Sequence, residues 1–270
     1  MPDALDFELP LLEIENRIAA LQSNADGPRA RDEIAKLEDR LARLRQKTYS
    51  SLTAWQRTQL ARHPKRPHTR DFFKLLFEDF VELHGDRVFG DDAAVVAGLA
   101  RFEGQGVVVI GHQKGRDTRE KIARNLREMA GLRTPILTVV TGEGGSGGAL
   151  AIGMGNRVLM LEYAIYSVIS PEGCAAILWG DASKAPEAAE SMRITAPDLL
   201  KLGVIDAIVP EPVGGAHRDW EGAAGHLREA LRDQLGQLTS KPADSLVAER
   251  YEKFRKIGAF EEASTPSAGA

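Results

Sequence analysis

The order of apolar and polar positions divides the chain into a helical start and a longer stretch in which helices alternate with strands. Before residue 50, apolar side chains recur every three or four positions on either side of a breaker at residues 24–28. This spacing predicts two amphipathic helices, and so a helical hairpin over residues 1–50. Two helices alone leave apolar surface to bury, so we expect the hairpin both to brace its own domain and to contact a neighbouring subunit. The apolar positions are Leu11, Ile14, Ile18, Leu21, Ile34, Leu37, Leu41 and Leu44.

From residue 51 onward, short apolar runs typical of buried strands alternate with helical spacing. Runs at 94–102 and 107–110 flank a glycine-containing turn and predict a β-hairpin. Strands alternating with helices predict an α/β domain over residues 51–258, wound as a coil of β-β-α turns, and then a disordered tail at 259–270. Further strands are expected at 136–140, 157–161, 164–169 and 204–209, and helices at 52–62, 71–84, 118–132, 198–202, 219–238 and 245–257, with others starting at residues 171 and 184.

Composition narrows the class of protein. Hydrophobic residues make up 43% and charged residues 27% of the 270 positions, as in an ordinary globular protein. The net charge of −4 gives no reason to expect a nucleic-acid partner. The single cysteine, Cys174, excludes an internal disulfide and a cysteine-based zinc site in this chain. An acidic start unlike a signal peptide, and no run as long as a membrane span, predict a cytoplasmic protein without a membrane partner.

The candidate chemistry lies in a glycine-rich stretch at residues 141–150. Five of the seven residues from Gly142 to Gly148 are glycine, between an apolar strand run and a run of small residues that starts a helix. Glycines allow a positive φ and a close approach to a ligand. Consecutive N–H groups at a helix start favour a phosphate, a carboxylate or the oxyanion of a transition state. Lys114 and Arg116, after another strand run, either contact such an anion or are solvated, and the same two alternatives apply to the basic connection at 62–70.

The same stretch also fits a hydrolase pattern. Gly144, Ser146 and Gly148 match G-x-S-x-G, the nucleophile elbow of α/β hydrolases. The match is weak because a run of glycines fits many patterns. A hydrolase requires Ser146 for activity, whereas an oxyanion site requires the small size of the glycines beside it. The acid and base of a triad are available downstream as Asp198, Asp206, His217 and His226.

Several long motifs, in order along nearly the whole chain, resemble the α-subunit family of bacterial acetyl-CoA carboxylase carboxyltransferases. They are residues 5–8 (LDFE), 54–56 (AWQ), 59–64 (QLARHP), 111–116 (GHQKGR), 123–129 (ARNLREM), the glycine stretch, 166–174 (YSVISPEGC) and 210–218 (PEPVGGAHR).

The resemblance implies a crotonase-like fold of β-β-α turns and a defined reaction. The carboxyl group of carboxybiotin, on a carrier protein, passes to acetyl-CoA and gives malonyl-CoA for fatty-acid biosynthesis. Negative charge then develops on the biotin ureido oxygen and on the thioester, where fixed N–H donors stabilise it. By resemblance, Gly147 and Gly148 supply the backbone pair that faces biotin, and Ser146 shapes the turn. The substrate-binding residues implied are Gly144, Gly145, Ser146, Lys114, Gly115 and Arg116.

The resemblance also implies partners. These are a β subunit with a zinc ribbon and most of the coenzyme A site, the biotin carboxyl carrier protein and biotin carboxylase, with two α and two β subunits in the carboxyltransferase. Biotin is carried by the partner and a coenzyme A thioester is the substrate. ATP is used only at the biotin carboxylase component, and no metal is expected in this chain.

The chain departs from the family pattern at one place. Between the positions of Ile122 and Ala123, family members have a further helix, strand and loop containing Asp-Thr-Pro-Gly-Ala-Tyr-Pro-Gly, which here is missing. The joined helix remains amphipathic, so we expect the runs at 107–110 and 136–140 to become neighbouring strands through a single right-handed crossover. In the family the missing loop belongs to the active-site wall. An impaired or non-catalytic scaffold subunit is therefore the alternative to an active enzyme.

Overall fold

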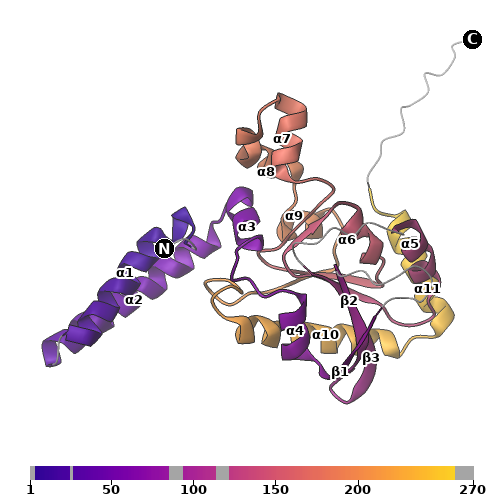
Figure 1. The fold of residues 1–270 in the computed structure, drawn as a ribbon, viewed down its shortest axis with the longest axis horizontal. Coiled ribbons are helices and arrows are strands. Elements are labelled where there is room, and N and C mark those ends of the chain that lie inside the picture. Colours follow the sequence, from indigo (N-terminus) through magenta and orange to yellow (C-terminus); the bar gives the residue numbers. More distant parts are fainter. Residues whose placement is uncertain (1–3, 25–26, 85–93, 114–121, 259–270) are drawn as a thin grey trace, which may run out of the picture.

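The N-terminal region forms a long helical hairpin. The computed structural model describes residues 4–24, 27–84, 94–113 and 122–258, so the tail expected at 259–270 lies outside the described residues. After a short 3₁₀ turn, α1 (Leu9–Asn24) and α2 (Pro28–Ser50) extend together away from the body of the molecule (Figure 1). Their stripes pack on each other, with Leu11, Ile14, Ile18, Leu37 and Leu41 buried in one apolar cluster.

The base of the hairpin is fixed to the body through α3 (Ala54–Ala61). This helix starts with a reciprocal cap, because the Gln56 N–H donates to Thr53 Oγ1 (3.1 Å) and the Thr53 N–H donates to Gln56 Oε1 (2.9 Å). Leu60 of α3 and Tyr163 of the body are buried in the same cluster as the hairpin. The hairpin is therefore packed onto its own chain at its base.

The helix expected at 71–84 is wrong in its second half. α4 (Thr69–Leu76) ends at Phe77, whose backbone is extended, and β1 (Glu78–Leu83) follows. β1 pairs antiparallel with β2 (Val95–Phe102). Gly98 makes room for β1, since a Cβ there would lie 2.5 Å from the Phe80 ring. Pairing with a free strand edge thus outweighs the helical spacing of this segment.

The β-hairpin predicted after residue 93 is confirmed. β2 pairs antiparallel with β3 (Gln105–His112) along its whole length. The two residues between them, Glu103 and Gly104, both have positive φ (50° and 80°). That combination matches the right-handed twist of the strands and gives a tight two-residue turn.

A separate parallel sheet forms the centre of the body. β6 (Arg157–Leu161) lies between β4 (Leu137–Val140) and β8 (Ala207–Val209). Leu159, Met160 and Leu161 are fully buried, as expected of a parallel strand covered on both faces. β5 (Glu143–Gly145) and β7 (Ile165–Ser167) form a further parallel pair.

Helices surround these sheets. α10 (Trp220–Thr239) packs on α4 and β4, and α7 (Pro171–Trp179) and α8 (Ala185–Met192) project from the body (Figure 1). α5 (Ile122–Gly131) lies beside α11 (Ala243–Arg255), whose Arg250 donates to the carbonyls of Met129 (2.8 Å) and Leu132 (2.9 Å). α6 (Ser146–Ile152) and α9 (Ala196–Lys201) complete the set. No helix in the described part of the chain combines the length and apolar character needed to cross a membrane.

The two three-stranded sheets do not meet, so the expected closed crossover unit is wrong. Among the described strands, β3 pairs with β2 alone and β4 with β6 alone. Other contacts hold the β1–β3 sheet in place: the Thr69 hydroxyl of α4 donates to the His112 carbonyl, and Arg232 of α10 pairs with Glu103 in the β2–β3 turn. These contacts hold the β1–β3 sheet apart from β4, and a gap lies between the two sheets.

Candidate active site

The glycine stretch forms the turn from β5 into α6. Gly145 is the residue before the helix, and Gly147 and Gly148 lie in the first turn of α6, where backbone N–H groups have no acceptor within the helix. The residue with a left-handed backbone is Ser146, at φ 53°. The glycines of this turn are free to adopt a positive φ, but among the described residues it is the serine that does so.

The glycines instead allow close packing on one side and leave the other side open. A Cβ on Gly144 would lie 2.9 Å from the Tyr166 ring and 3.1 Å from Val140 Cγ1. On Gly142 it would lie 3.1 Å from the Ala61 carbonyl oxygen. A Cβ on Gly145 would meet nothing within 4 Å. The turn is thus pressed against β7 and α3 while Gly145 stays accessible.

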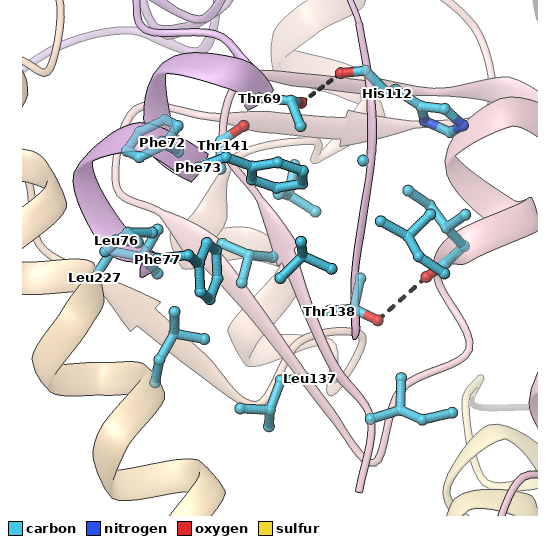
Figure 2. A pocket seen from close by; sticks show the side chains of 18 of the residues that line it. Thr69, Phe72, Phe73, Leu76, Phe77, His112, Leu137, Thr138, Thr141 and Leu227 are labelled. Atoms are coloured by element: carbon cyan, nitrogen blue, oxygen red, sulfur yellow. Dashed lines mark hydrogen bonds between the residues drawn. The ribbon is translucent and has the colours of Figure 1, made fainter. Parts of the chain in front are cut away.

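A cleft of about 1110 Å³ reaches from this turn into the gap between the sheets. β3 and β4 form its two walls, and α4 and α10 supply apolar side chains between them (Figure 2). Of the expected site residues, Gly144, Gly145 and Gly148 line the cleft. Lys114, Gly115 and Arg116 lie outside the described residues. Figure 2 shows Phe72, Phe73, Phe77, Leu137, Thr138 and Leu227 along the cleft.

Arg66 fixes the approach to the glycine turn. Its Nε donates to the Thr141 carbonyl (2.8 Å), and its two terminal nitrogens pair with Glu211 at 3.0 and 2.5 Å. Both side chains are buried, and Glu211 also accepts from the N–H groups of Tyr163 and Ala216. Such a bidentate, fully hydrogen-bonded pair is costly to break. Arg66, in the basic connection at 62–70, is therefore neither solvated nor available to a ligand.

Arg62 joins the glycine turn to α7. It pairs with Glu143 of β5 (2.7 Å) and with Glu172 in the first turn of α7 (2.5 Å). The hydrogen bond from Arg62 is the main reason that the pKa of Glu172 lies below its ordinary value. The start of α7 is thereby positioned beside the turn.

The residues of the possible hydrolase triad are not assembled. No hydrogen bond in the described part of the chain joins Ser146 to any of the four candidates. Asp198 accepts from Thr195, Asp206 accepts from the Val158 N–H, His217 contacts Glu8, and His226 contacts the Pro210 carbonyl. The strained turn resembles a nucleophile elbow, but among the described residues no base is hydrogen-bonded to Ser146.

A second polar cluster, which the sequence reasoning missed, lies under the hairpin. Glu8 is buried and accepts from Tyr49 Oη (2.6 Å) and Arg218 Nε (3.1 Å), and it lies 3.2 Å from His217 Nε2. The His63 ring is 4.2 Å from that of His217. Burial alone would raise the pKa of Glu8, but the hydrogen bonds from His217 and Tyr49 lower it to about 2. The signal was present, because three of the family motifs, at 5–8, 59–64 and 210–218, meet here.

Within the described residues, this cluster is the group that could hold a metal ion. Glu8, His63 and His217 bring possible ligand atoms within 4.8 Å of one another. However, the Glu8 oxygen that faces His217 already accepts from Tyr49 and from the Arg218 guanidinium. A cation there would face the positive charge of Arg218. The cluster therefore fits an ion-pair lock between hairpin and body better than a metal centre.

Two solved structures share the fold of this chain. The chain superposes on the transcarboxylase 12S crystal structure with methylmalonyl-coenzyme A and methylmalonic acid bound, with a TM-score of 0.52 at 15% identity, over 65% of this chain and 42% of that chain. It superposes on a Pseudomonas malonate decarboxylase hetero-dimer with a TM-score of 0.50 at 14% identity, over 69% and 96% of the two chains. The fold is therefore crotonase-like, as the resemblance implied.

Sequence comparison identifies the family within this class. The family model described as acetyl co-enzyme A carboxylase carboxyltransferase-like matches residues 4–126 and 119–258. The chain is 47% identical to the acetyl-coenzyme A carboxylase carboxyl transferase subunit alpha of Geobacter metallireducens, covering 96% of this chain and 98% of that protein. It is 48% identical to the subunit of the same name from Thermus thermophilus, covering 96% and 99%. The chain belongs to the acetyl-coenzyme A carboxylase carboxyl transferase α-subunit family.

The same alignments show where a segment is missing. The alignment with the Geobacter protein has 312 positions, whereas 96% of 270 residues is about 259, so about 53 positions face no residue of this chain. The family model matches in two pieces that overlap at residues 119–126, around Ile122 and Ala123. In the fold, Ile122 and Ala123 are the first two residues of α5, the helix that follows β3 in the chain. The missing segment therefore falls where the gap between the sheets opens.

Proposed function

We propose that this chain is the α subunit of an acetyl-CoA carboxylase carboxyltransferase, which moves the carboxyl group of carboxybiotin onto acetyl-CoA and forms malonyl-CoA. The observation that carries the proposal is the glycine turn, which opens onto a cleft in a chain that aligns with carboxyl transfer subunits over nearly its whole length. The reaction supplies malonyl-CoA at the first committed step of fatty-acid biosynthesis.

The proposed catalytic groups are the backbone N–H groups of Gly147 and Gly148. Negative charge develops on the ureido oxygen of biotin as its carboxyl group leaves, and on the thioester as acetyl-CoA loses a proton. Donors fixed at a helix start stabilise such charge without reorganisation. The open flank of Gly145 leaves room for a ligand beside them. Substrate contacts are proposed for Gly144, Gly145, Ser146, Lys114, Gly115 and Arg116.

The partners proposed are those of the α-subunit family. A β subunit with a zinc ribbon would provide most of the coenzyme A site and the second pair of donors, in an assembly of two α and two β subunits. A biotin carboxyl carrier protein would bring carboxybiotin, made by a biotin carboxylase that uses ATP. Biotin would thus reach the site on a partner, with the coenzyme A thioester as substrate.

The surface proposed for the β subunit is the exposed end of α7. Ile177, Leu178 and Trp179 are three consecutive large apolar residues exposed there, and Val168 is exposed just before the helix. Apolar groups gathered in this way are typical of a subunit interface. The hairpin, which extends from the body, is proposed as a further subunit contact.

The test is carboxyl transfer by the assembled enzyme. This chain, produced with the β subunit of the same genome, is mixed with carboxylated carrier protein and acetyl-CoA, and malonyl-CoA is measured by mass spectrometry. Gly148→Val should strongly reduce the product while the α–β complex still purifies, because Gly148 lines the cleft and a valine side chain there would compete with the ligand for the space beside the N–H donors. Loss of one such donor typically lowers the rate ~100- to 1000-fold. An undiminished rate in the variant complex would disprove the proposed role of the turn.

A non-catalytic scaffold subunit is the second candidate, favoured by the gap between β3 and β4. Such a subunit would bind the β subunit as tightly as an active one and produce no malonyl-CoA. Co-purification and turnover, measured on the same preparation, separate the two functions.

A further inference from the structure

Two strand edges line the cleft, and on each of them outward backbone groups have no hydrogen-bond partner in the described part of the chain: those of Val108 and Ile110 on β3, and those of Leu137 and Val139 on β4. On β3, the Gln113 N–H donates to the Ala94 carbonyl beside β2 (2.8 Å). Because backbone groups alternate along an antiparallel ladder, those of Val108 and Ile110 point away from β2. The His112 carbonyl is in the same phase and accepts from Thr69 of α4, which agrees with this direction.

The second edge is on β4. The Ile136 carbonyl accepts from the Asn156 N–H at the start of β6 (2.8 Å), so the backbone groups of Leu137 and Val139 point to the other side. Residues of both edges line the one cleft. The cleft therefore presents a row of donors and acceptors on each of two walls, which is the arrangement that a strand between them requires.

The side chains of the cleft are suited to an apolar segment. Val108 and Ile110 of β3 are 65% and 47% exposed, although a strand of this composition is normally covered. Phe73 of α4, Phe77 directly after it and Leu231 of α10 line the cleft. Its volume of about 1110 Å³ exceeds the ~300–1000 Å³ typical of small-molecule pockets. The buried amide oxygen of Gln113, at one end, has no hydrogen-bond partner among the described residues.

We propose that this cleft accepts an extended apolar segment of another polypeptide, which inserts as a strand between β3 and β4. The occupant would resemble the segment of about 53 alignment positions that the Geobacter relative has and this chain lacks, since the two pieces of the family match meet at the start of α5, directly after β3 in element order. Strand addition supplies hydrogen bonds to both edges and covers the apolar walls at once. The proposal does not rest on carboxyl transfer by this chain.

The test uses a synthetic peptide with the sequence that the Geobacter metallireducens relative has between the positions of Ile122 and Ala123. Binding of the fluorescent peptide to the full chain is measured by anisotropy, beside a scrambled peptide of the same composition. Amide hydrogen exchange of the complex locates the contact. We expect saturable binding of the native-order peptide only, with slower exchange at Val108, Ile110, Leu137 and Val139 and no change in β8.

Val108→Pro tests the backbone contact directly. Proline removes an N–H that points into the cleft and leaves the bonds from β3 to β2 intact, a position that edge strands tolerate. We expect it to weaken peptide binding about ten-fold, as for the loss of one buried hydrogen bond, and Val108→Ala, which keeps the N–H, to weaken it less. If the proline variant does not fold, N-methylation of alternate peptide residues tests the same contact, because it removes the hydrogen bonds that the peptide N–H groups donate to the strand carbonyls.

Three results would overturn the proposal. The first is that the peptide does not bind, or that the scrambled peptide binds equally, since the cleft would then be a non-specific apolar surface. The second is that the peptide slows amide exchange at sites away from β3 and β4. The third is that sedimentation shows the free chain to be a dimer and that Val108→Pro abolishes this dimer, since the occupant would then be a second copy of the chain. None of these readouts depends on turnover. Failure of the proposed enzyme activity and failure of the proposed peptide binding can therefore be told apart.

Discussion

At the scale of single residues, two neighbouring glycines of the turn are small for different reasons, one for packing within the protein and one for access of a ligand. Gly144 is pressed against Tyr166 and Val140, so its lack of a side chain serves packing. Gly145 has an extended backbone, with φ −139°, and open space around it, so its small size matters only to a ligand. The strained position between strand and helix belongs to Ser146. Strain at such a position is typical of functional turns.

Alanine at Gly144 should therefore lower the stability of the fold, whereas alanine at the adjacent Gly145 should lower activity and leave stability unchanged. Gly144→Ala should lower the free energy of unfolding by about 1–3 kcal/mol, because its Cβ overpacks the Tyr166 contact. Gly145→Ala, the matched control, should leave it unchanged and reduce carboxyl transfer. Urea unfolding and transfer assays on both variants check this. Equal stability of the two variants would contradict the packing assignment.

Ser146→Ala distinguishes turn geometry from nucleophilic catalysis. Alanine keeps the backbone strain and removes the hydroxyl, which has no hydrogen-bonded base among the described residues. We expect the rate of carboxyl transfer to change only a few-fold, whereas a catalytic serine typically contributes ~10⁶-fold. The measurement is the initial rate of malonyl-CoA formation by the α–β complex. A loss of several orders of magnitude in a folded variant would restore the hydrolase-type role of Ser146.

The sequence indicated the chemistry of this turn but not its conformation. A strand run, a cluster of glycines and small helix-forming residues were enough to predict N–H groups at a helix start. Which residue takes the left-handed backbone depends on how β5 pairs with β7 and how Tyr166 packs against the turn. Those are contacts between segments distant in sequence. Spacing within the glycine stretch carries no information about them.

At the scale of secondary-structure elements, strong periodicity identified the long helices, whereas tertiary pairing decided the short segments. α1, α2 and α10 lie where their apolar spacing predicts. Residues 71–84 have helical spacing as well, yet their second half pairs with β2, because Val81 and Leu83 complete the ladder opposite Leu99 and Ala97. A free strand edge is a requirement of the fold, and local spacing cannot show it.

The hairpin is joined to the body through the Glu8 cluster, and this predicts a dependence on pH. The pKa of Glu8 in the folded protein, about 2, lies below its ordinary value of 4.5. A lowered pKa stabilises the fold above pH 4.5, and this stabilisation is lost as the pH falls toward 2. Glu8→Gln should thus lower the free energy of unfolding at pH 7 by about 3 kcal/mol, with a difference that shrinks below pH 4.5.

The measurement is urea unfolding of both proteins between pH 7 and pH 2. Glu38→Gln is the matched control, since Glu38 lies exposed on α2 and should have no effect at any pH. A stability difference between wild type and Glu8→Gln that stays constant over the whole pH range would show that the charge of Glu8 does not lock the hairpin.

At the scale of the whole molecule, the fold survives the loss of an internal segment because its two sheets are held separately. The β1–β3 sheet is anchored to α4 and α10, and β4 is anchored to β6. The resemblance to the family predicted the fold class and the position of the missing segment. It could not predict that the gap stays open, because that depends on whether anchoring contacts outweigh the burial gained by closing the sheet.

The open gap leads to a prediction about the rate of the assembled enzyme. The cleft between β3 and β4 reaches the glycine turn and is lined by Gly148, so the missing segment leaves one side of the proposed site without a wall. Displacements of about 1 Å at a reacting centre can cost ~100-fold in rate. We expect this chain with its β subunit to form malonyl-CoA at least ~100-fold more slowly than the Geobacter α subunit with its own β subunit, under the same carrier and acetyl-CoA concentrations. Both α subunits must co-purify with their partners, so that a slow rate reflects chemistry and not failed assembly. Comparable rates in that assay would show that the wall is dispensable, and that the glycine turn and the partner subunit suffice to position the reacting groups.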